Sequence, residues 1–321
     1  MTQTDDYVLG RGIADSIRLA SPVSVLGSTK YPNLKMAIAL ILVMIRLDAQ
    51  HLLWKLYRGH DLHPLIPMTD GMKIAELGTG TASWIFGLAR QLPPTVELHG
   101  FDICDHQFPV KNLWPQNVSL RVLDSLVDPP ASMCGQYDVV HLRMWASNLR
   151  ENIISALVRH IKFLLSMKIF AYRIEIGNCS LLTTQEPGGY IQWEEADLVH
   201  QRVQGEGAAS FEQNINDLFN KANLDYRWVS ELPSFLETEK FKIIESDTGV
   251  FEHELVQLCT NTYLLALREI LQGIKRILGQ DLPLVIAEQE LALYRLLLQN
   301  TRVVYNWSPV VLLAQSQEVE V

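Results

Sequence analysis

The chain has 321 residues, 48% of them apolar and 20% charged, a composition that excludes a disordered or fibrous protein and is typical of a folded globular one. The 36 acidic side chains outnumber the 27 basic ones and give a formal net charge of −9, which argues against nucleic acid as the main partner. The four cysteines form no CxxC pair and the N-terminus lacks the basic and apolar regions of a signal peptide, so we expect free thiols and a cytoplasmic location.

The longest apolar run, Met36 to Ile45, has ten residues and lies between Lys35 and Arg46. A helix needs roughly 20 apolar residues to cross a bilayer. We therefore predict a buried helix or an interfacial segment here, and no membrane partner.

The middle of the chain alternates short apolar runs with helical patterns. The runs predicted as strands are Lys73–Leu77, Val96–Phe101, Val118–Val122, Tyr137–Leu142 and Gly188–Trp193. Helices are predicted over Ser83–Gln91, before Pro93-Pro94, and through Ile153, Leu157 and Ile161. This alternation predicts parallel βαβ units, and therefore an α/β fold with a Rossmann-like, doubly wound, mainly parallel sheet. In such a sheet the ligand lies beyond the carboxyl ends of the strands.

The last third of the chain begins with a helical, amphipathic pattern, clearest over Phe251–Leu278 and Leu284–Leu298. These helices could cover the ligand. The end of the chain, from Arg302 to Leu313, reads as a last strand with an irregularity at Pro309, and Phe241–Glu245 as its antiparallel neighbour.

The segment Glu76–Thr81 follows the first predicted strand. Gly78 and Gly80 allow a tight turn there and a close approach of the backbone to a ligand, although NAD enzymes have such a turn at the same point. Asp102 ends the second strand 22 residues after Gly80, where a carboxylate could accept bonds from both ribose hydroxyls. Asp124 follows the third strand after another 22 residues, where it could accept from an adenine amine.

Glu76 favours S-adenosylmethionine over NAD, because a carboxylate beside the glycines would repel a pyrophosphate and attract an ammonium and a sulfonium. Ser83 also replaces the third glycine of the dinucleotide fingerprint. In the alternative interpretation Glu76 caps a neighbouring helix, and Asp102 and Asp124 are loop residues. The common position of the three after consecutive strands favours a cofactor site.

These motifs resemble those of the fungal class I S-adenosylmethionine-dependent methyltransferases of secondary metabolism, the LaeA-like and UMTA-like family, which also includes nuclear regulators. The resemblance is carried by Lys73–Thr81, Gly100–Ile103 with Phe108-Pro109, Asn117–Asp124, Tyr137–Arg143, Pro187–Glu195 and, upstream, Tyr7–Gly12 and Gln50-His51 with His63-Pro64. It implies S-adenosylmethionine as cofactor, bound by Glu76, Gly78, Thr79, Gly80, Asp102, Ile103, Asp124, Ser125, Leu142 and Arg143, the last two near the reacting methyl. Ala82-Ser83 departs from the family, whose members usually have a glycine-containing pair there.

The resemblance also implies three segments. Residues 1–70 would form an N-terminal helical cap, residues 71–195 the Rossmann-like core that binds S-adenosylmethionine, and residues 196–321 a helical substrate cap with the final strands of the sheet.

Two stretches interrupt the family's motifs. Ser16–Leu19 should run directly into Asp48–His51, and the 28 residues from 20 to 47 intervene. Similarly, Phe163–Leu165 should lead to Pro187 with one residue between, and the 20 residues from 166 to 185 match nothing expected. Both stretches have the length of short fungal introns read in frame, so unspliced introns are one hypothesis and true insertions the other.

Methyl transfer from a sulfonium needs no base, since holding nucleophile and methyl in line supplies most of the rate. For a phenol or acid as acceptor, His141 or His200 could take the proton, although a hydrogen-bonded core histidine is the favoured interpretation of His141. A metal at His60 and His63 is disfavoured because no cysteine is near and Pro64 follows.

Tyr190, Trp193 and Trp145 could form the wall of an aromatic substrate pocket, or belong to the core. Three functions compete. The first is methylation of a small-molecule fungal metabolite at oxygen or nitrogen. The second is a regulatory or protein-directed methyltransferase with a protein partner, cytoplasmic or nuclear, and the third is a methyltransferase-like protein without catalytic activity.

Overall fold

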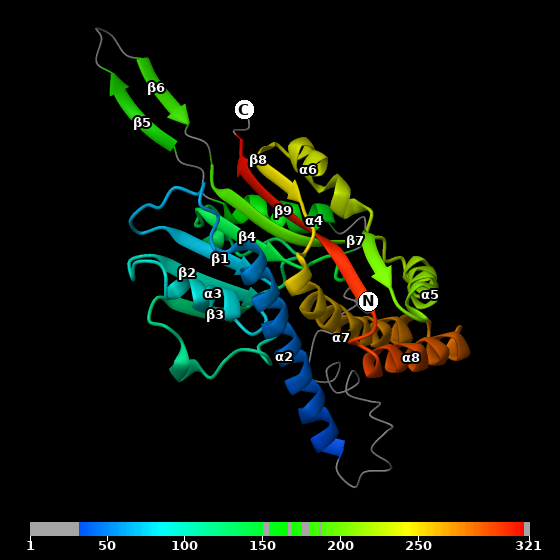
Figure 1. Ribbon diagram of the computed structural model, residues 1–321. Coiled ribbons are helices and arrows are strands. Elements are labelled where there is room, and N and C mark those ends of the chain that lie inside the picture. Colours follow the sequence, from blue (N-terminus) through cyan, green and yellow to red (C-terminus); the bar gives the residue numbers. More distant parts are fainter. Residues whose placement is uncertain (1–31, 150–153, 166–168, 175–179, 186–187, 318–321) are drawn as a thin grey trace.

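The computed structural model describes residues 32–149, 154–165, 169–174, 180–185 and 188–317. Its centre is a seven-stranded sheet in the order β3-β2-β1-β4-β7-β9-β8 (Figure 1). The strands are β1 (Lys73–Leu77), β2 (Glu97–Asp102), β3 (Val118–Val122), β4 (Val139–Arg143), β7 (Tyr190–Gln204), β8 (Phe241–Thr248) and β9 (Val304–Ser316). β1 pairs parallel with β2 and β4, β2 with β3, and β4 with β7, whereas β9 runs antiparallel to both β7 and β8. The predicted doubly wound, mainly parallel sheet with a terminal antiparallel strand is confirmed.

Helices cover both faces of the sheet. They are α2 (Pro32–Arg58), α3 (Ser83–Ala89), α4 (Ile154–Leu164), α5 (Ala208–Lys221), α6 (Trp228–Thr238), α7 (His253–Leu278) and α8 (Pro283–Leu298), with short 3₁₀ turns at Lys111–Leu113 and Ala131–Met133. Alternate residues of the central strands face opposite ways, so Val139 packs with α3 in one core cluster, and Val140 with α4 in the other. Burial of both faces explains why β1 and β4 read as nearly continuous apolar runs.

The fifth strand of the core is longer than predicted. β7 was expected to end at Trp193 but continues to Gln204, and the first helix after it begins only at Ala208. The prediction was wrong because Glu194, Glu195 and Asp197 break the apolar pattern although all three side chains are buried in the sheet. The pairing of β9 with β7 is regular at Pro309, where an irregularity was predicted, and the register shifts just beside it, between Ser308 and Asn306 of β9 and between Asp197 and Arg202 of β7.

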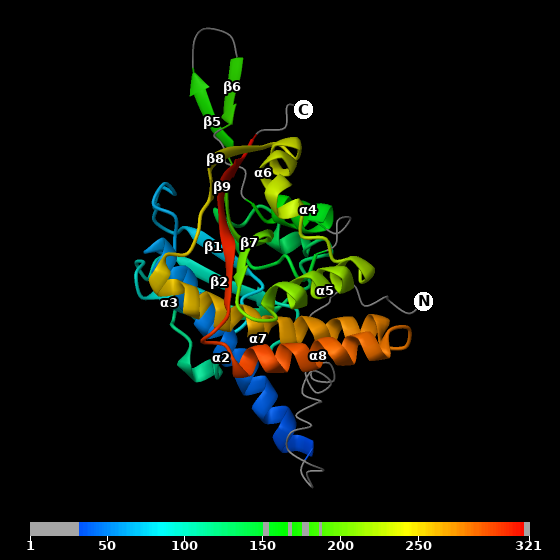
Figure 2. The ribbon, with the colours of Figure 1, turned by 45° about the vertical axis from the view of Figure 1, so that its right-hand side comes forward.

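The helix α2 crosses the edge of the sheet and packs against α7 (Figures 1 and 2). It contains the apolar run Met36 to Ile45 and is much longer than that run. By length and composition alone its segment Ala37–Arg58 would suffice to cross a membrane, with 28% of the most apolar window buried. Core helices of soluble proteins pass the same test, and Leu53 and Trp54 of α2 are fully buried in the protein core.

The second interrupting stretch contains the strands β5 (Ile169–Ile174) and β6 (Ser180–Gln185), which pair antiparallel in a two-stranded sheet of their own. This hairpin projects away from the main sheet in both views (Figures 1 and 2). The chain on either side of it closes up again: a Cβ added to Gly189 would lie 2.9 Å from Cδ2 of Leu165. The hairpin is therefore an excursion between two neighbouring points of the core.

Candidate functional site

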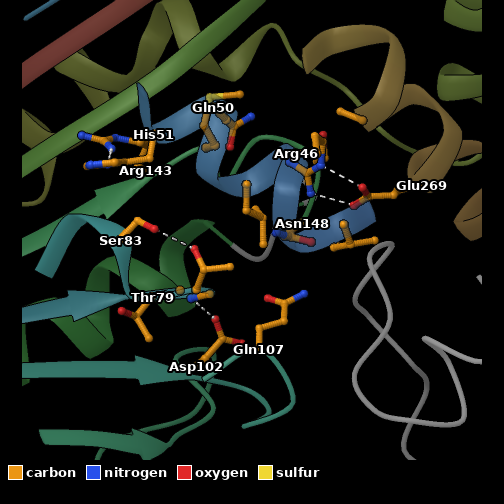
Figure 3. Close-up of a pocket in the computed structure, with 18 of the residues that line it drawn as sticks. Arg46, Gln50, His51, Thr79, Ser83, Asp102, Gln107, Arg143, Asn148 and Glu269 are labelled. Carbon is orange, nitrogen blue, oxygen red and sulfur yellow. Dashed lines mark hydrogen bonds and ion pairs between the residues drawn. The ribbon is translucent and has the colours of Figure 1, made fainter. Parts of the chain in front are cut away.

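A cavity of about 250 Å³ lies at the carboxyl ends of the first strands. Its floor comes from the chain that follows β1, β2, β3 and β4, and α2 and α7 form the walls above it (Figure 3). This is the edge where a doubly wound sheet binds its ligand, since the strand order reverses between β1 and β4. Eight of the ten predicted cofactor residues line it, namely Glu76, Gly78, Thr79, Gly80, Asp102, Ile103, Ser125 and Arg143.

The glycine turn brings bare backbone to the cavity. Gly78 and Gly80 have φ values of +73° and +52°, in the left-handed region that favours glycine. The N–H groups of Gly78 and Thr79 both donate to the carbonyl of Phe101, which fixes the turn against β2. A Cβ on Gly78 would lie 3.2 Å from the indole ring of Trp145, so a side chain there would crowd the cavity wall.

The Asp102 carboxylate is held at the rim of the glycine turn. Its Oδ2 accepts a hydrogen bond of 2.8 Å from the N–H of Gly80 (Figure 3). Burial raises the pKa of Asp102 above its usual value, while backbone N–H donors oppose the rise. Asp124 does not line the cavity itself: its Oδ1 accepts from the N–H of Leu126, and its neighbours Leu123 and Ser125 supply the wall.

Glu76 lines the cavity with a buried carboxyl that accepts a hydrogen bond from the hydroxyl of Thr79. Burial raises the pKa of Glu76 to about 8. Behind it, His141 is fully buried, stacks on the ring of Trp84, and has its ring nitrogens 3.7 Å from Glu76 and 3.5 Å from Glu194. Burial lowers the pKa of His141 to about 4.

His141 is therefore a core residue by position and does not line the cavity. The weak candidacy of His141 as a base has no support in this geometry, because its nitrogens face the two carboxyls within the protein. Leu142, predicted near the reacting methyl, is likewise fully buried in the core, whereas the next residue, Arg143, reaches the cavity. His200 also lies outside the cavity wall, with a 70% exposed side chain that contacts Asp197.

Arg143 joins β7 to α2. Its guanidinium donates to the carboxylate of Glu194 and, through Nη1, to Nδ1 of His51 at 3.1 Å (Figure 3). Burial opposes ionisation of Glu194, but the charge of Arg143 outweighs it and holds the pKa of Glu194 well below its usual value. His51 lines the cavity from α2, and burial together with Arg143 lowers its pKa to about 4.

A second ion pair ties the two walls together. Arg46 of α2 donates two hydrogen bonds of 2.7 Å to the carboxylate of Glu269 on α7, and the two side chains are only 7% and 12% exposed (Figure 3). Around this pair the wall is apolar, with Ala39, Leu42 and Val43 facing Leu265, Ala266 and Ile270. Further along α2, Asp48 accepts from the hydroxyls of Thr81 and Ser83, which anchors the helix to the glycine turn.

The contribution of α2 and α7 to the site was not predicted from the sequence. Arg46, Glu269 and His51 were not assigned to it, although the Gln50-His51 pair was part of the resemblance. Of the three aromatic candidates Trp145 lines the cavity, whereas Trp193 lies in the core and Tyr190 packs at its edge. Among the described residues no group of three or more His, Cys, Asp or Glu side chains could hold a metal ion.

The sheet order, the single reversed strand β9 and the cavity beside the glycine turn occur together in one known architecture. The chain has the class I methyltransferase fold. In solved structures it is similar to phosphoethanolamine N-methyltransferase 2 of Haemonchus contortus, with 11% identity, 88% of this chain and 58% of that one covered, and a TM-score of 0.47. It is also similar to a methyltransferase from Aquifex aeolicus, with 10% identity, 56% and 78% covered, and a TM-score of 0.37. These scores are low, so the fold assignment rests on the strand order.

No protein-family model matches the chain. Among curated proteins it is 30% identical over 160 residues to methyltransferase grgD of a Penicillium species, which covers 47% of this chain and 48% of that one. It is 38% identical to N-methyltransferase tcpN of Claviceps purpurea over 30% of this chain and 36% of that one. With N-methyltransferase sirN of Leptosphaeria maculans it shares 40% over 31% and 34%. The matches span about half or less of the length of these relatives.

Proposed function

We propose that this chain is an S-adenosylmethionine-dependent methyltransferase that acts on a small molecule. The observation that carries the proposal is the Asp102 carboxylate, held by the N–H of Gly80 beside a turn of two glycines in the left-handed region. A carboxylate fixed there suits a ribose, because it can accept a hydrogen bond from each of the two hydroxyls. The bare backbone of the turn suits a closely packed ligand, since a Cβ on Gly78 would crowd Trp145.

The charges at the cavity support S-adenosylmethionine over a dinucleotide. The carboxyl of Glu76 is buried and lies at the cavity wall without a salt-bridge partner among the described lysines and arginines. A ligand with an ammonium and a sulfonium would stabilise the ionised form of Glu76, whereas a pyrophosphate would oppose its ionisation and leave a buried carboxyl without a charged partner.

Bound S-adenosylmethionine would supply an activated methyl group. The chain itself would hold the acceptor in place through the apolar side chains of α2 and α7. The Arg46–Glu269 pair would keep these two walls together and exclude water from the cavity. A concave cavity of about 250 Å³ favours a small molecule over a folded protein as acceptor.

We further propose nitrogen as the accepting atom. Two of the relatives described above are N-methyltransferases by name. The chemistry is compatible with this, because a neutral amine attacks through its own lone pair and needs no base.

The test is binding of S-adenosylhomocysteine by calorimetry. Asp102→Ala should lose at least tenfold in affinity, because hydrogen bonds to a charged acceptor contribute about 1.5–3 kcal/mol. Asp105→Ala is the matched control, since this exposed carboxylate lies three residues further on and outside the cavity wall. Unchanged affinity in Asp102→Ala, or binding of NAD by the parent protein, would contradict the assignment.

A second experiment identifies the class of acceptor. Enzyme, labelled methyl donor and extracts of a producing fungus should give a metabolite that is heavier by one methyl group. Label that appears only on protein, or only when a protein partner is added, would favour the regulatory function instead.

A further inference from the structure

His51 lines the cavity, but neither the family resemblance nor the proposed function assigns it a role. It lies on α2 and faces Arg143, which follows directly on the β4 residues paired with β1. In that pairing Glu76 is the partner of His141, so Glu76 and Arg143 come to the same edge of the sheet. The cavity thus has the carboxyl of Glu76 on one side and, near it on the other side, the guanidinium of Arg143 with the imidazole of His51.

The protonation state of His51 follows from its partner. A guanidinium can only donate, so Nδ1 of His51 must accept the 3.1 Å hydrogen bond from Nη1 of Arg143. A neutral imidazole with an accepting Nδ1 has its proton on Nε2. Among the described residues Nε2 has no hydrogen-bond partner, and the side chain lines the cavity, so this N–H is available to a ligand.

Arg143 is itself fixed in this role. Glu194, fully buried, binds the guanidinium through Nε and Nη2, which leaves Nη1 for His51. The chain Glu194–Arg143–His51 therefore presents a neutral donor backed by a positive charge. Such a group suits an anionic oxygen, and it cannot serve as a base because its one lone pair is already occupied.

We propose that His51 binds the carboxylate of the amino-acid end of the methyl donor through its Nε2–H. The amino-acid end is a zwitterion whose two charges are a few ångströms apart. Its ammonium would face Glu76, and its carboxylate would face His51 and the charge of Arg143 behind it. This inference rests on the proposed function, because it needs S-adenosylmethionine or its product as the ligand.

Two ligands test the assignment without any turnover. S-adenosylhomocysteine has the amino-acid end, and 5′-methylthioadenosine is the same nucleoside without it. By calorimetry, His51→Ala should weaken S-adenosylhomocysteine at least tenfold and change methylthioadenosine by less than about twofold. His51→Gln, whose amide also has an N–H donor, should restore most of the lost affinity. His200→Gln is the matched control, since that histidine is 70% exposed and outside the cavity wall.

The outcomes separate this inference from the proposed function. If the parent protein binds S-adenosylhomocysteine but His51→Ala affects both ligands equally, or neither, the role of His51 is wrong and the proposed function stands. If the parent protein binds neither ligand, the proposed function fails first. Thermal unfolding of each variant shows that a loss of affinity is not a loss of fold.

The tautomer can be measured directly in the unliganded full chain by nitrogen-15 NMR of the histidine rings, with His51 assigned by the signal that disappears in His51→Gln. We expect a proton on Nε2 alone at pH 7.5 and still at pH 5.5, because burial and the charges of Arg143 and Lys55 oppose a second proton more than Asp61 favours it, with His141 a smaller opposing contribution. A proton on Nδ1 at pH 7.5 would overturn the proposed hydrogen bond and with it the inference.

Discussion

At the scale of single residues, Gly78 in the glycine turn is constrained both by its backbone conformation and by the packing of the cavity wall. Gly78 has a φ of +73° and a Cβ there would lie 3.2 Å from Trp145, so it has both a conformational and a packing constraint. Gly78→Ala should therefore destabilise the protein more than the roughly 1–2 kcal/mol that a left-handed residue costs by itself. The measurement is the free energy of unfolding by denaturant titration.

Gly135 separates the two contributions. Its φ of +68° is nearly the same, but nothing lies within 4 Å of an added Cβ. Gly135→Ala should show the conformational cost alone, and the difference between the two variants measures the crowding against Trp145. Equal effects would mean that Trp145 moves aside without cost.

The site residues that could be predicted from the sequence are those whose position follows from the pattern of the neighbouring residues. Gly78, Gly80 and Asp102 follow strand ends, and the position of strand ends in a parallel sheet is readable from apolar runs. Arg46 and Glu269 were missed because their contact joins residues 223 positions apart, and nothing in either segment alone indicates the other.

At the scale of secondary-structure elements, the β5–β6 hairpin should be dispensable. It forms its own sheet, and Leu165 and Gly189 lie side by side at its base. Deletion of residues 166–185 leaves three residues to join Leu165 to Gly189. We expect the shortened protein to unfold at a temperature within a few degrees of the parent and to bind S-adenosylhomocysteine equally well. A Gly-Ser loop in place of the hairpin is the control for loop length. Insoluble protein from both variants would show that the hairpin is part of the fold.

Unlike the hairpin, the first interrupting stretch contributes to the cavity, because its residues 39, 40, 42, 43, 46 and 47 line the wall. Deletion of residues 20–47 joins Ile17-Arg18-Leu19 to Asp48, the same tripeptide that precedes Asp48 as Ile45-Arg46-Leu47 in the full chain. Residues 17–19 lie outside the described part of the structure. If the stretch is intronic, Arg18 should take the place of Arg46 and pair with Glu269.

We therefore expect the shortened protein to fold and to bind S-adenosylhomocysteine. Arg18→Ala should destabilise it by about as much as Arg46→Ala destabilises the full chain, some 3–5 kcal/mol for a buried pair that loses one partner. Arg11→Ala in the shortened protein is the matched control. A shortened protein that fails to fold, beside a full chain that binds the ligand, means that residues 20–47 are a true part of the protein. Sequencing the transcript is the independent check.

The predicted elements were most accurate where apolar runs are uninterrupted and least accurate where polar side chains are buried. β3 has the predicted bounds and β4 is displaced by only one or two residues. The second half of β7 could not be predicted, because Glu194 is buried only through its pairing with Arg143 of the neighbouring strand, and this depends on the tertiary fold.

At the scale of the whole molecule, buried histidines and buried carboxyls have opposite effects on how the free energy of unfolding depends on pH. Burial lowers the pKa of His51 and His141 to about 4, so the unfolded chain binds more protons than the folded one between about pH 4 and 6.5, and stability rises with pH there. Burial raises the pKa of Glu76 to about 8, and of Glu195 and Glu212 to about 7. Between pH 4.5 and these values the folded chain binds more protons, so the carboxyls lower stability as pH rises.

Above pH 6.5 the histidines no longer contribute, and we expect the free energy of unfolding to fall between pH 6.5 and 8. Each carboxyl still protonated in the folded chain contributes up to about 1.4 kcal/mol per pH unit. Denaturant titrations at several pH values measure this slope. Since Gln does not titrate, Glu76→Gln should reduce the slope, most clearly between pH 7 and 8, where Glu76 has the highest of the three pKa values.

Saturation with S-adenosylhomocysteine should reduce the pH dependence of stability as Glu76→Gln does, for an electrostatic reason. An ammonium beside Glu76 lowers its pKa, so in the complex the carboxyl is already ionised at pH 7 and its part of the slope disappears. Ligand binding at pH 7 should therefore release a proton, seen as a binding enthalpy that differs between phosphate and Tris buffers in the parent and not in Glu76→Gln. A slope that stays the same with ligand, together with buffer-independent enthalpies, would mean that the ammonium of the ligand lies away from Glu76.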